Sequence, residues 1–210
     1  MRKQYKYPFR NKKLSRTQVK NNILAVLKEA DNESYINGSI WYDVANGIAK
    51  KLIVASETEI NLAQAVGLIA ALSPLKSWEQ NIQLAYEFVI GKRSGHTKLC
   101  VGKANDILAL NNPSVDEVVE VLSGQKTVNF FLNIYYPNED AAITIDRHAV
   151  GIALIGTKKI KLTEEECKPT KAQFEFLVHC YKWAASELSL SAVQLQAITW
   201  EHFRNIKVKR

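Results

Sequence analysis

The chain has 210 residues, of which 47% are hydrophobic and 23% are charged. This balance excludes an intrinsically disordered chain, and the length suits one large domain or one helical domain with two lobes. The net charge of +7 favours an anionic partner, nucleic acid first, although charge alone fixes no function. The N-terminus is basic without an apolar core after it, and no apolar run approaches ~18 residues. We therefore expect a cytoplasmic protein with no membrane partner.

The three cysteines, Cys100, Cys167 and Cys180, lie far apart in the chain. No two of them have the short spacing of metal ligands, and no four-ligand cluster can be drawn. We therefore predict no metal site, no iron–sulfur cluster and no other cofactor. Cysteines without paired spacing fit a reducing compartment. We also expect a monomer.

The pattern along the chain predicts an all-α protein. A basic arm that carries aromatic side chains is expected over residues 1–14, followed by a single domain over 15–210. Ser15 has the residue type and the place of a helix N-cap. The apolar residues after it recur at helical spacing, which predicts a helix over 16–30.

A loop and a second helix are predicted next. Residues 31–38 are mostly polar and lack an apolar stripe, so we expect a loop there. A helix is predicted over 39–53. Its aliphatic residues, among them Ile40 and Val44, are expected to face the core.

The next predicted helix belongs in the centre of the core. Ser56 and Glu59 have the spacing of a capping box, which places the start of this helix at about residue 57. Its second half is apolar nearly all round, as expected of a helix that is buried on every side. It is predicted to end at Ser73-Pro74, because proline cannot continue a helix.

Capped helices continue through the second half of the chain. Ser77 and Ser114 are expected N-caps, the latter with a glutamate three residues on. The stretch 142–145 alternates weakly and is the best candidate for a strand. Helices are predicted over 78–90, 101–110, 115–122, 126–136, 170–188 and 191–203.

A very short turn, Ser123-Gly124-Gln125, separates two of these helices. Such a tight turn requires a residue that tolerates φ > 0, and Gly124 supplies it. The first N–H groups of the helix after the turn have no intrahelical partners and lie at the positive end of the helix dipole. They therefore suit a phosphate.

Lys126 and Asp146 are the candidate chemical groups. Lys126 lies in the first turn of that helix, where the dipole disfavours a cation by about a few tenths of a kcal/mol or more. Two interpretations stay open: a solvated surface lysine, or a lysine whose neutral, nucleophilic form is favoured. Asp146 precedes an apolar run and suits an N-cap. That role is compatible with catalysis, because capping holds the carboxylate in one rotamer.

Two motifs carry a resemblance to a known family. Gly-Gln-Lys-Thr-Val-Asn (124–129) is followed by Ile-Asp-Arg-His-Ala-Val (145–150). This pair resembles the helix-hairpin-helix DNA glycosylases of the endonuclease III type. Leu68-Ile-Ala-Ala-Leu-Ser73 is similar to the apolar helix that starts the core of that family. The resemblance covers roughly residues 60–205 and implies a two-lobed helical bundle with a helix-hairpin-helix motif.

The resemblance also implies a reaction on DNA. Such enzymes flip a base out of the duplex, because the glycosidic carbon is unreachable in the stack. Lys126 would attack C1′ and form a Schiff base, which adds AP-lyase activity. Asp146 would stabilise the positive charge that develops on the sugar and help to activate the nucleophile. The hairpin would bind DNA through Ser123, Gly124, Gln125 and Thr127.

The excised base would lie between aromatic or apolar walls. Trp41, Tyr42 and Trp78 are candidates, although each also suits the core or its rim. Gln196 and Trp200 are four residues apart in the last predicted helix and share a face, so they are candidates for the mouth of a pocket.

The chain also departs from the family pattern. Leu122-Ser123 stand where the family has the first hairpin glycine and an apolar residue, and Pro74-Leu75-Lys76 replaces its stacking glutamine. The C-terminal four-cysteine cluster is missing, which excludes the iron–sulfur version. Arg147 adds a cation beside Asp146 and favours an anionic substrate. These differences concern the substrate more than the fold.

Two alternatives to a DNA glycosylase stay open. One is an enzyme of base hypermodification similar to phage-encoded relatives of the superfamily (thymine pyrophosphorylase-like), which would act in the host cytoplasm. The other is a DNA-binding module that uses the hairpin without catalysis.

Overall fold

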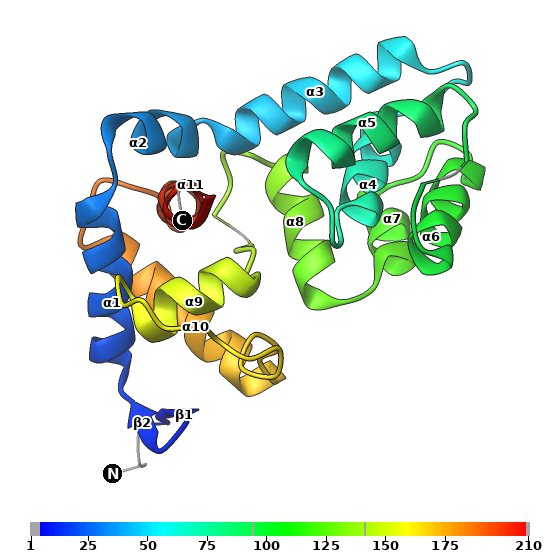
Figure 1. Ribbon diagram of the computed structural model, residues 1–210. Helices are drawn as coiled ribbons and strands as arrows, with labels where there is room; N and C mark the ends of the chain where they lie inside the picture. The colour runs from blue at the N-terminus through cyan, green and yellow to red at the C-terminus, as the bar shows by residue number, and fades with distance from the viewer. Residues whose placement is uncertain (1–4, 94, 141, 209–210) are drawn as a thin grey trace. The chain divides into compact units, whose positions relative to one another are not determined.

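The computed structural model describes residues 5–93, 95–140 and 142–208 (Figure 1). Over these residues the chain forms eleven α-helices and one two-stranded antiparallel sheet, which confirms the predicted all-α class. The stretch 142–145, predicted as a possible strand, is not a strand where it is described. No helix in the described part of the chain is long and apolar enough to cross a membrane. The elements are β1 (Tyr7–Phe9), β2 (Lys12–Leu14), α1 (Arg16–Glu29), α2 (Asn32–Ser39), α3 (Trp41–Ala55), α4 (Leu62–Leu72), α5 (Trp78–Val89), α6 (Lys98–Ala109), α7 (Val115–Leu122), α8 (Gln125–Tyr135), α9 (Arg147–Ile155), α10 (Lys171–Ser186) and α11 (Ala192–Val208).

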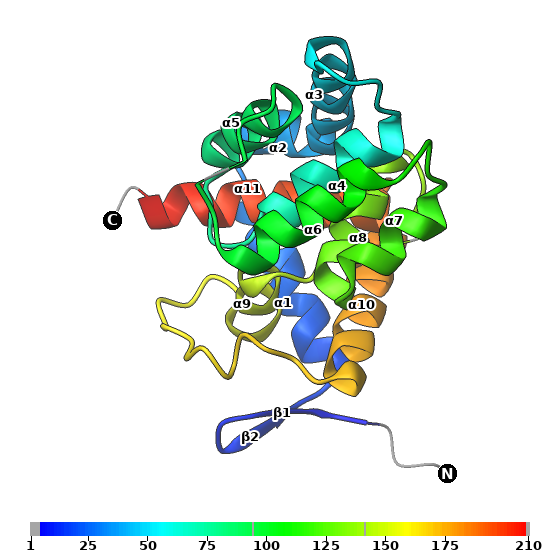
Figure 2. The same cartoon turned by 90° about the vertical axis from the view of Figure 1, so that its right-hand side faces the viewer.

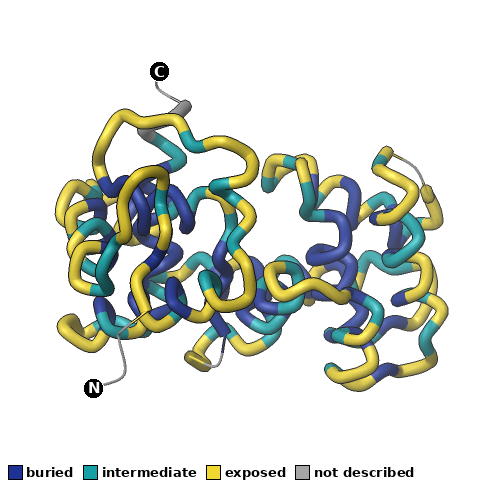
Figure 3. Tube along the Cα trace, turned by 90° about the horizontal axis from the view of Figure 1, so that it is seen from below, coloured by how far each residue is buried: buried dark blue, intermediate teal, exposed yellow. Residues whose placement is uncertain are grey.

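The chain divides into two compact units. Unit 2 is continuous and runs from Tyr42 to Ala142. Unit 1 combines the residues up to Trp41 with those from Ile143 onward, so α1 and α2 belong with α9, α10 and α11. Figure 3 shows that the buried residues lie mainly within the helices, whereas the connecting loops are largely exposed.

Helix α1 of unit 1 contacts α9, α10 and α11 (Figure 2). It begins where the sequence predicts, because Ser15 caps it and forms a capping box with Gln18. The predicted apolar stripe is confirmed, because Val19, Ile23 and Val26 are buried. The apolar face of α1 is buried against three neighbouring helices. This packing stabilises the helix more than the helix propensity of its sequence alone would.

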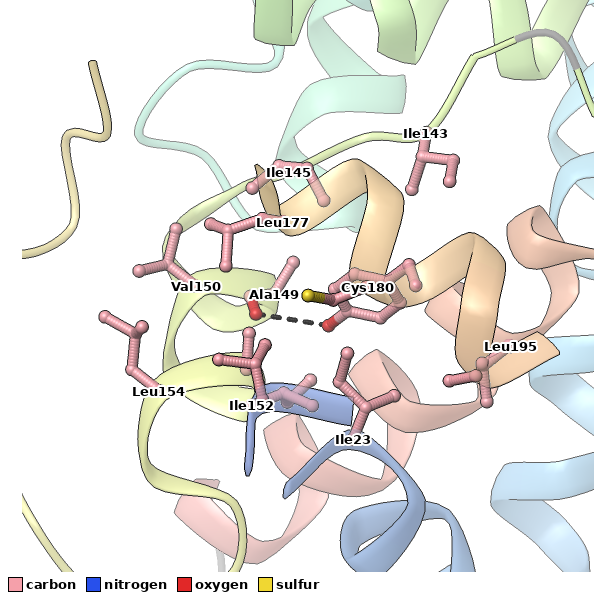
Figure 4. Packing of buried hydrophobic residues seen from close by; sticks show 14 of the residues in the cluster. Ile23, Ile143, Ile145, Ala149, Val150, Ile152, Leu154, Leu177, Cys180 and Leu195 are labelled. Atoms are coloured by element: carbon pink, nitrogen blue, oxygen red, sulfur yellow. Dashed lines mark hydrogen bonds between the residues drawn. The ribbon is translucent and has the colours of Figure 1, made fainter. Parts of the chain in front are cut away.

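Tyr181 of α10 links this core to the first turn of α9. Its hydroxyl donates a hydrogen bond to the carbonyl of Ala149 at 3.1 Å, the dashed line in Figure 4. The neighbouring Cys180 is also fully buried, and burial raises the pKa of its thiol to about 12. Cys180 therefore stays protonated and acts as a small apolar residue.

The predicted loop over 31–38 is wrong, because α2 forms there. Asp31 caps this helix and accepts a hydrogen bond from the Ser34 N–H at 2.8 Å. The sequence did not predict this helix because its residues are mostly polar and form no apolar stripe. The helix packs instead through a close approach of its backbone to another helix. A Cβ atom at Gly38 would lie 2.3 Å from the Cα atom of Ile198 in α11.

The described part of the predicted basic arm contains a β-hairpin, in which Tyr7 pairs with Leu14; residues 1–4 lie outside the described residues. The Tyr7 side chain is buried and packs on the ring of Phe176 with 5.9 Å between centroids. Arg10 at the turn forms an ion pair with Glu166 at 2.7 Å. Part of the arm is therefore built into unit 1.

Helix α4 is the centre of unit 2 and contacts α5, α6, α7 and α8. All residues from Ala63 to Leu72 are buried, as the sequence predicts for a central helix. Its predicted start at Ser56 is wrong. Asn61 caps the helix in a capping box with Gln64, and its side chain also donates to the carbonyl of Pro113 at 2.8 Å. This long-range bond favours the later start.

The buried face of α3 also differs from the prediction. Ile40 and Val44 are about half exposed, at 48% and 49%. The buried face carries Leu52 together with small and polar residues such as Ala49 and Asn46, and the Asn46 amide donates to the carbonyl of Ile134 at 2.9 Å. The prediction is therefore correct for Leu52 and wrong for Ile40 and Val44. A hydrogen-bonded asparagine shares the buried face because it can be buried at low cost.

Gly38→Ala is expected to destabilise the protein by about 3 kcal/mol or more, because its Cβ would collide with the backbone of α11, which cannot move aside as a side chain can. The matched control is Gly47→Ala in α3, where an added Cβ meets nothing within 4 Å. Removing a helical glycine there should stabilise by about 0.5–1 kcal/mol. Urea unfolding followed by circular dichroism measures both; equal stability of the two variants would contradict the close approach.

Candidate functional site

In unit 2 the predicted short turn, Ser123-Gly124, joins α7 to α8, and this segment is called here the α7–α8 hairpin. Both turn residues have positive φ, 45° at Ser123 and 82° at Gly124. For serine this conformation is uncommon and needs support from its surroundings. Lys103 of α6 gives that support, because its ammonium donates to the Leu122 carbonyl and, at 2.8 Å, to the Ser123 hydroxyl.

The N-terminus of α8 is open to solvent. Its N-cap is Gly124, and no described side chain caps it. Gly124 and Gln125 are exposed, and Thr127 is half-buried. The first N–H groups of the helix are thus the kind of donor that binds a phosphate oxygen.

Lys126 is the second residue of α8, and its side chain is exposed. It lies in the first turn of the helix, as predicted, and so adds a cation to the same end that carries the positive pole of the dipole. With Lys103 at the turn, two ammonium groups belong to this hairpin and its support. Such a concentration of positive charge favours an anion.

Asp146 is the N-cap of α9 in unit 1, as the sequence predicts. One carboxylate oxygen, Oδ1, accepts from the backbone N–H groups of His148 at 2.9 Å and Ala149 at 2.8 Å. The other, Oδ2, accepts from the indole N–H of Trp200 in α11 at 3.0 Å. Three donors therefore hold a half-buried carboxylate in one rotamer, and hydrogen bonds to an ionised acceptor are stronger than neutral ones.

The ring of Trp200 is itself held by its neighbours. The guanidinium of Arg204 lies over the ring, 4.7 Å from its centroid. Trp41 and His148 approach it edge-on, with centroids at 5.9 Å and 6.1 Å. All of these residues belong to unit 1, so Asp146 lies at the end of a packed aromatic cluster.

Glu201 joins two members of this cluster. It is buried, it accepts from the Arg204 guanidinium at 3.2 Å, and it is hydrogen-bonded to Trp41. Burial raises the pKa of the Glu201 carboxyl above its ordinary value near 4.5, and the charge of Arg204 and the two hydrogen bonds offset this only in part. Trp41 and Arg204, which both touch Trp200, are thus tied to one acidic side chain.

The remaining candidates for the pocket lie in different settings. Tyr42 is buried in unit 2, where its ring packs edge-on against Phe130 with 6.5 Å between centroids. Trp78 is the first residue of α5 and is half-buried. Arg147, the first residue of α9, is exposed next to Asp146. Among the described residues, no group of three His, Cys, Asp or Glu could hold a metal ion.

The structure brings two groups of the predicted residues together. The first is the α7–α8 hairpin, with Lys126, in unit 2. The second is Asp146 with Trp200 and Trp41, in unit 1. The pairing of Lys126 with Asp146 stays a prediction from the sequence, because the two residues belong to different units.

The sequence did not predict two of the contacts at these residues. The hydrogen bond between Trp200 and Asp146 joins residues 54 positions apart, and the bond between Lys103 and Ser123 spans 20 positions. Only Trp200 gave a signal, since it lies four residues after Gln196 on the same helix face, and that spacing did not indicate Asp146 as its partner.

The buried carboxyl of Glu201 predicts a definite pH dependence of stability. Since its pKa is raised, the folded state binds this proton more tightly than the unfolded chain does. Its contribution to stability is therefore present below about pH 4.5 and is lost as the pH rises through the raised pKa. We expect the free energy of unfolding of the wild type, minus that of Glu201→Gln, to fall as the pH rises from about 4 to about 7. Urea unfolding of both proteins at each pH measures the difference, and a constant or rising difference would contradict the assignment.

Comparison with known proteins gives a family for the chain and no function. No curated protein and no solved structure matches it significantly. The model of one family of unknown function, DUF7178, matches residues 6–207, which is nearly the whole chain. The chain therefore belongs to the family of unknown function DUF7178.

Proposed function

We propose that the protein is a DNA N-glycosylase with AP-lyase activity, in which Lys126 is the nucleophile and Asp146 stabilises the positive charge on the sugar. The amine of Lys126 would bond to C1′ as the N-glycosidic bond breaks and the base leaves with the bonding electrons. The attacking nitrogen would then lose one proton, and ring opening with protonation of O4′ would give the protonated Schiff base. Loss of a proton from C2′ would then eliminate the 3′ phosphate.

The observation that carries the proposal is the geometry of Asp146. An anion that stabilises a developing cation must be ionised and must keep one orientation before the reaction begins. Three hydrogen-bond donors meet the second requirement here, because they hold the Asp146 carboxylate in one rotamer. The sequence motif that resembles the glycosylases assigns this role to the same residue.

The α7–α8 hairpin supports DNA as the substrate. Its exposed first-turn amides and the ammonium groups of Lys103 and Lys126 suit a phosphate, which every DNA sequence offers. Lys126 is exposed, as a nucleophile that meets a flipped nucleotide must be. The net charge of +7 favours the same partner.

The first test is a covalent trap of the lyase intermediate. A duplex that contains one abasic site presents an aldehyde, with which a neutral lysine condenses to an imine with loss of water. Borohydride reduces the imine to a stable amine that migrates as a protein–DNA band. We expect this band with the wild type and its loss, by about a hundredfold or more, with Lys126→Ala.

The matched control is Lys51→Ala, which removes an exposed lysine from α3 and should leave the band intact. A band of unchanged intensity with Lys126→Ala would overturn the role of Lys126. If the wild type binds DNA in a salt-dependent manner but neither forms the band nor releases a base, the result would favour the non-catalytic DNA-binding module.

The second test concerns the first N–H group of α8. Gln125→Pro removes that donor at the first helical position, where proline is tolerated. Gln125→Ala removes the side chain and its hydrogen bond to Asn129 but keeps the N–H. If the hairpin binds a phosphate through its amides, Gln125→Pro should weaken duplex binding roughly tenfold while Gln125→Ala binds like the wild type. Fluorescence anisotropy with a labelled duplex measures both, and equal affinities would argue against this contact.

A further inference from the structure

We infer that Trp200 is a positioning residue: its indole N–H holds Asp146 in the orientation that the reaction requires, and the Trp41–Glu201–Arg204 cluster holds Trp200. The inference rests on the proposed function for the role of Asp146, and it adds a residue to which the glycosylase-like motifs assign no role.

The two oxygens of Asp146 depend on different parts of the chain. Oδ1 accepts from the N–H groups of His148 and Ala149, which belong to the same helix end. Those bonds alone fix the N-cap but leave rotation of the carboxylate about its last bond less restricted. The bond from Trp200 to Oδ2 at 3.0 Å fixes the plane of the group from another helix. Trp200 therefore controls the direction in which the remaining lone pairs point.

The indole is placed with little freedom of its own. Arg204 covers one face at 4.7 Å, and Trp41 meets the ring at 5.9 Å between centroids. Both neighbours are hydrogen-bonded to the buried Glu201, so the arrangement forms a closed set of contacts within unit 1. A donor held in this way does not have to reorient when charge develops on the substrate. Electrostatic stabilisation of a transition state depends on such preorganisation.

The contact itself can be tested independently of any activity. The chain has four tryptophans, and each gives one indole N–H signal in a proton–nitrogen correlation spectrum. The signal lost in Trp200→Phe belongs to Trp200. Asp146→Asn keeps an oxygen for the helix cap and places an amide NH₂ toward the indole, so the Trp200 signal should move upfield and lose protection from hydrogen exchange. The Trp183 signal is the internal control, because Trp183 packs under Lys20 of α1.

The consequence for chemistry is tested by single-turnover cleavage of the abasic duplex, where the positive charge near Asp146 is that of the iminium formed between C1′ and Lys126. Trp200→Phe should lower the rate at saturating DNA roughly 10- to 100-fold, the range expected for one hydrogen bond to a charged group, with the half-saturating DNA concentration unchanged. Trp200→3-benzothienylalanine keeps the size of the ring and replaces only the N–H by sulfur. It should show the same loss, whereas Trp183→Phe should show none.

A double-mutant cycle separates positioning from a general structural effect. If Trp200 acts through Asp146, Trp200→Phe should cause no further loss in the Asp146→Asn background. Additive losses, or a full rate with 3-benzothienylalanine at a position whose indole signal responds to Asp146→Asn, would overturn the inference while the proposed function stands. If the wild type does not cleave the abasic duplex, the proposed function fails. The spectra then decide the contact alone, and an unmoved Trp200 signal in Asp146→Asn overturns it.

Discussion

Three hydrogen bonds converge on the carboxylate of Asp146: two come from backbone N–H groups at the beginning of α9, and the third, from Trp200, joins this helix end to α11. The first two satisfy N–H groups that a helix cannot satisfy by itself. The next residues of α9 lie in the core of unit 1, where the Ala149 carbonyl accepts a hydrogen bond from the hydroxyl of Tyr181. The residue proposed for catalysis is thus also the residue that sets where a core helix begins. Its geometry depends on the packing of α9, α10 and α11 together.

Local hydrogen bonding made the helix starts the most predictable feature of the fold. Ser15, Ser77, Ser114 and Asp146 are all N-caps, because a short polar side chain before an apolar run can bond the free amides whatever the tertiary context. Ser56 failed by the same criterion. The competing cap, Asn61, gains a bond to the distant Pro113 carbonyl, and no local pattern reveals such a gain.

The packing of helices that depend on close backbone contact or on buried polar side chains was the least predictable feature. Helix α2 has no apolar stripe and depends on the absence of a Cβ atom at Gly38. The inner face of α3 carries Asn46, whose amide is bonded to a carbonyl of α8, while the larger Val44 is exposed. For the candidate site, the sequence predicted the cap role of Asp146 and the open turn at Gly124. It could not predict Trp200 or Lys103 as their partners, because those contacts exist only after the helices pack.

The order of the chain through the two units also has a kinetic consequence. Unit 2 is one continuous segment, and α4 finds all four of its neighbours within that segment. Unit 1 must bring α1 against α9, α10 and α11, across more than a hundred intervening residues. Contacts of such separation carry a large loop-closure cost and form slowly. During synthesis unit 2 can therefore reach its native packing first. The apolar residues of α1 stay exposed to solvent until α9, α10 and α11 have been synthesised.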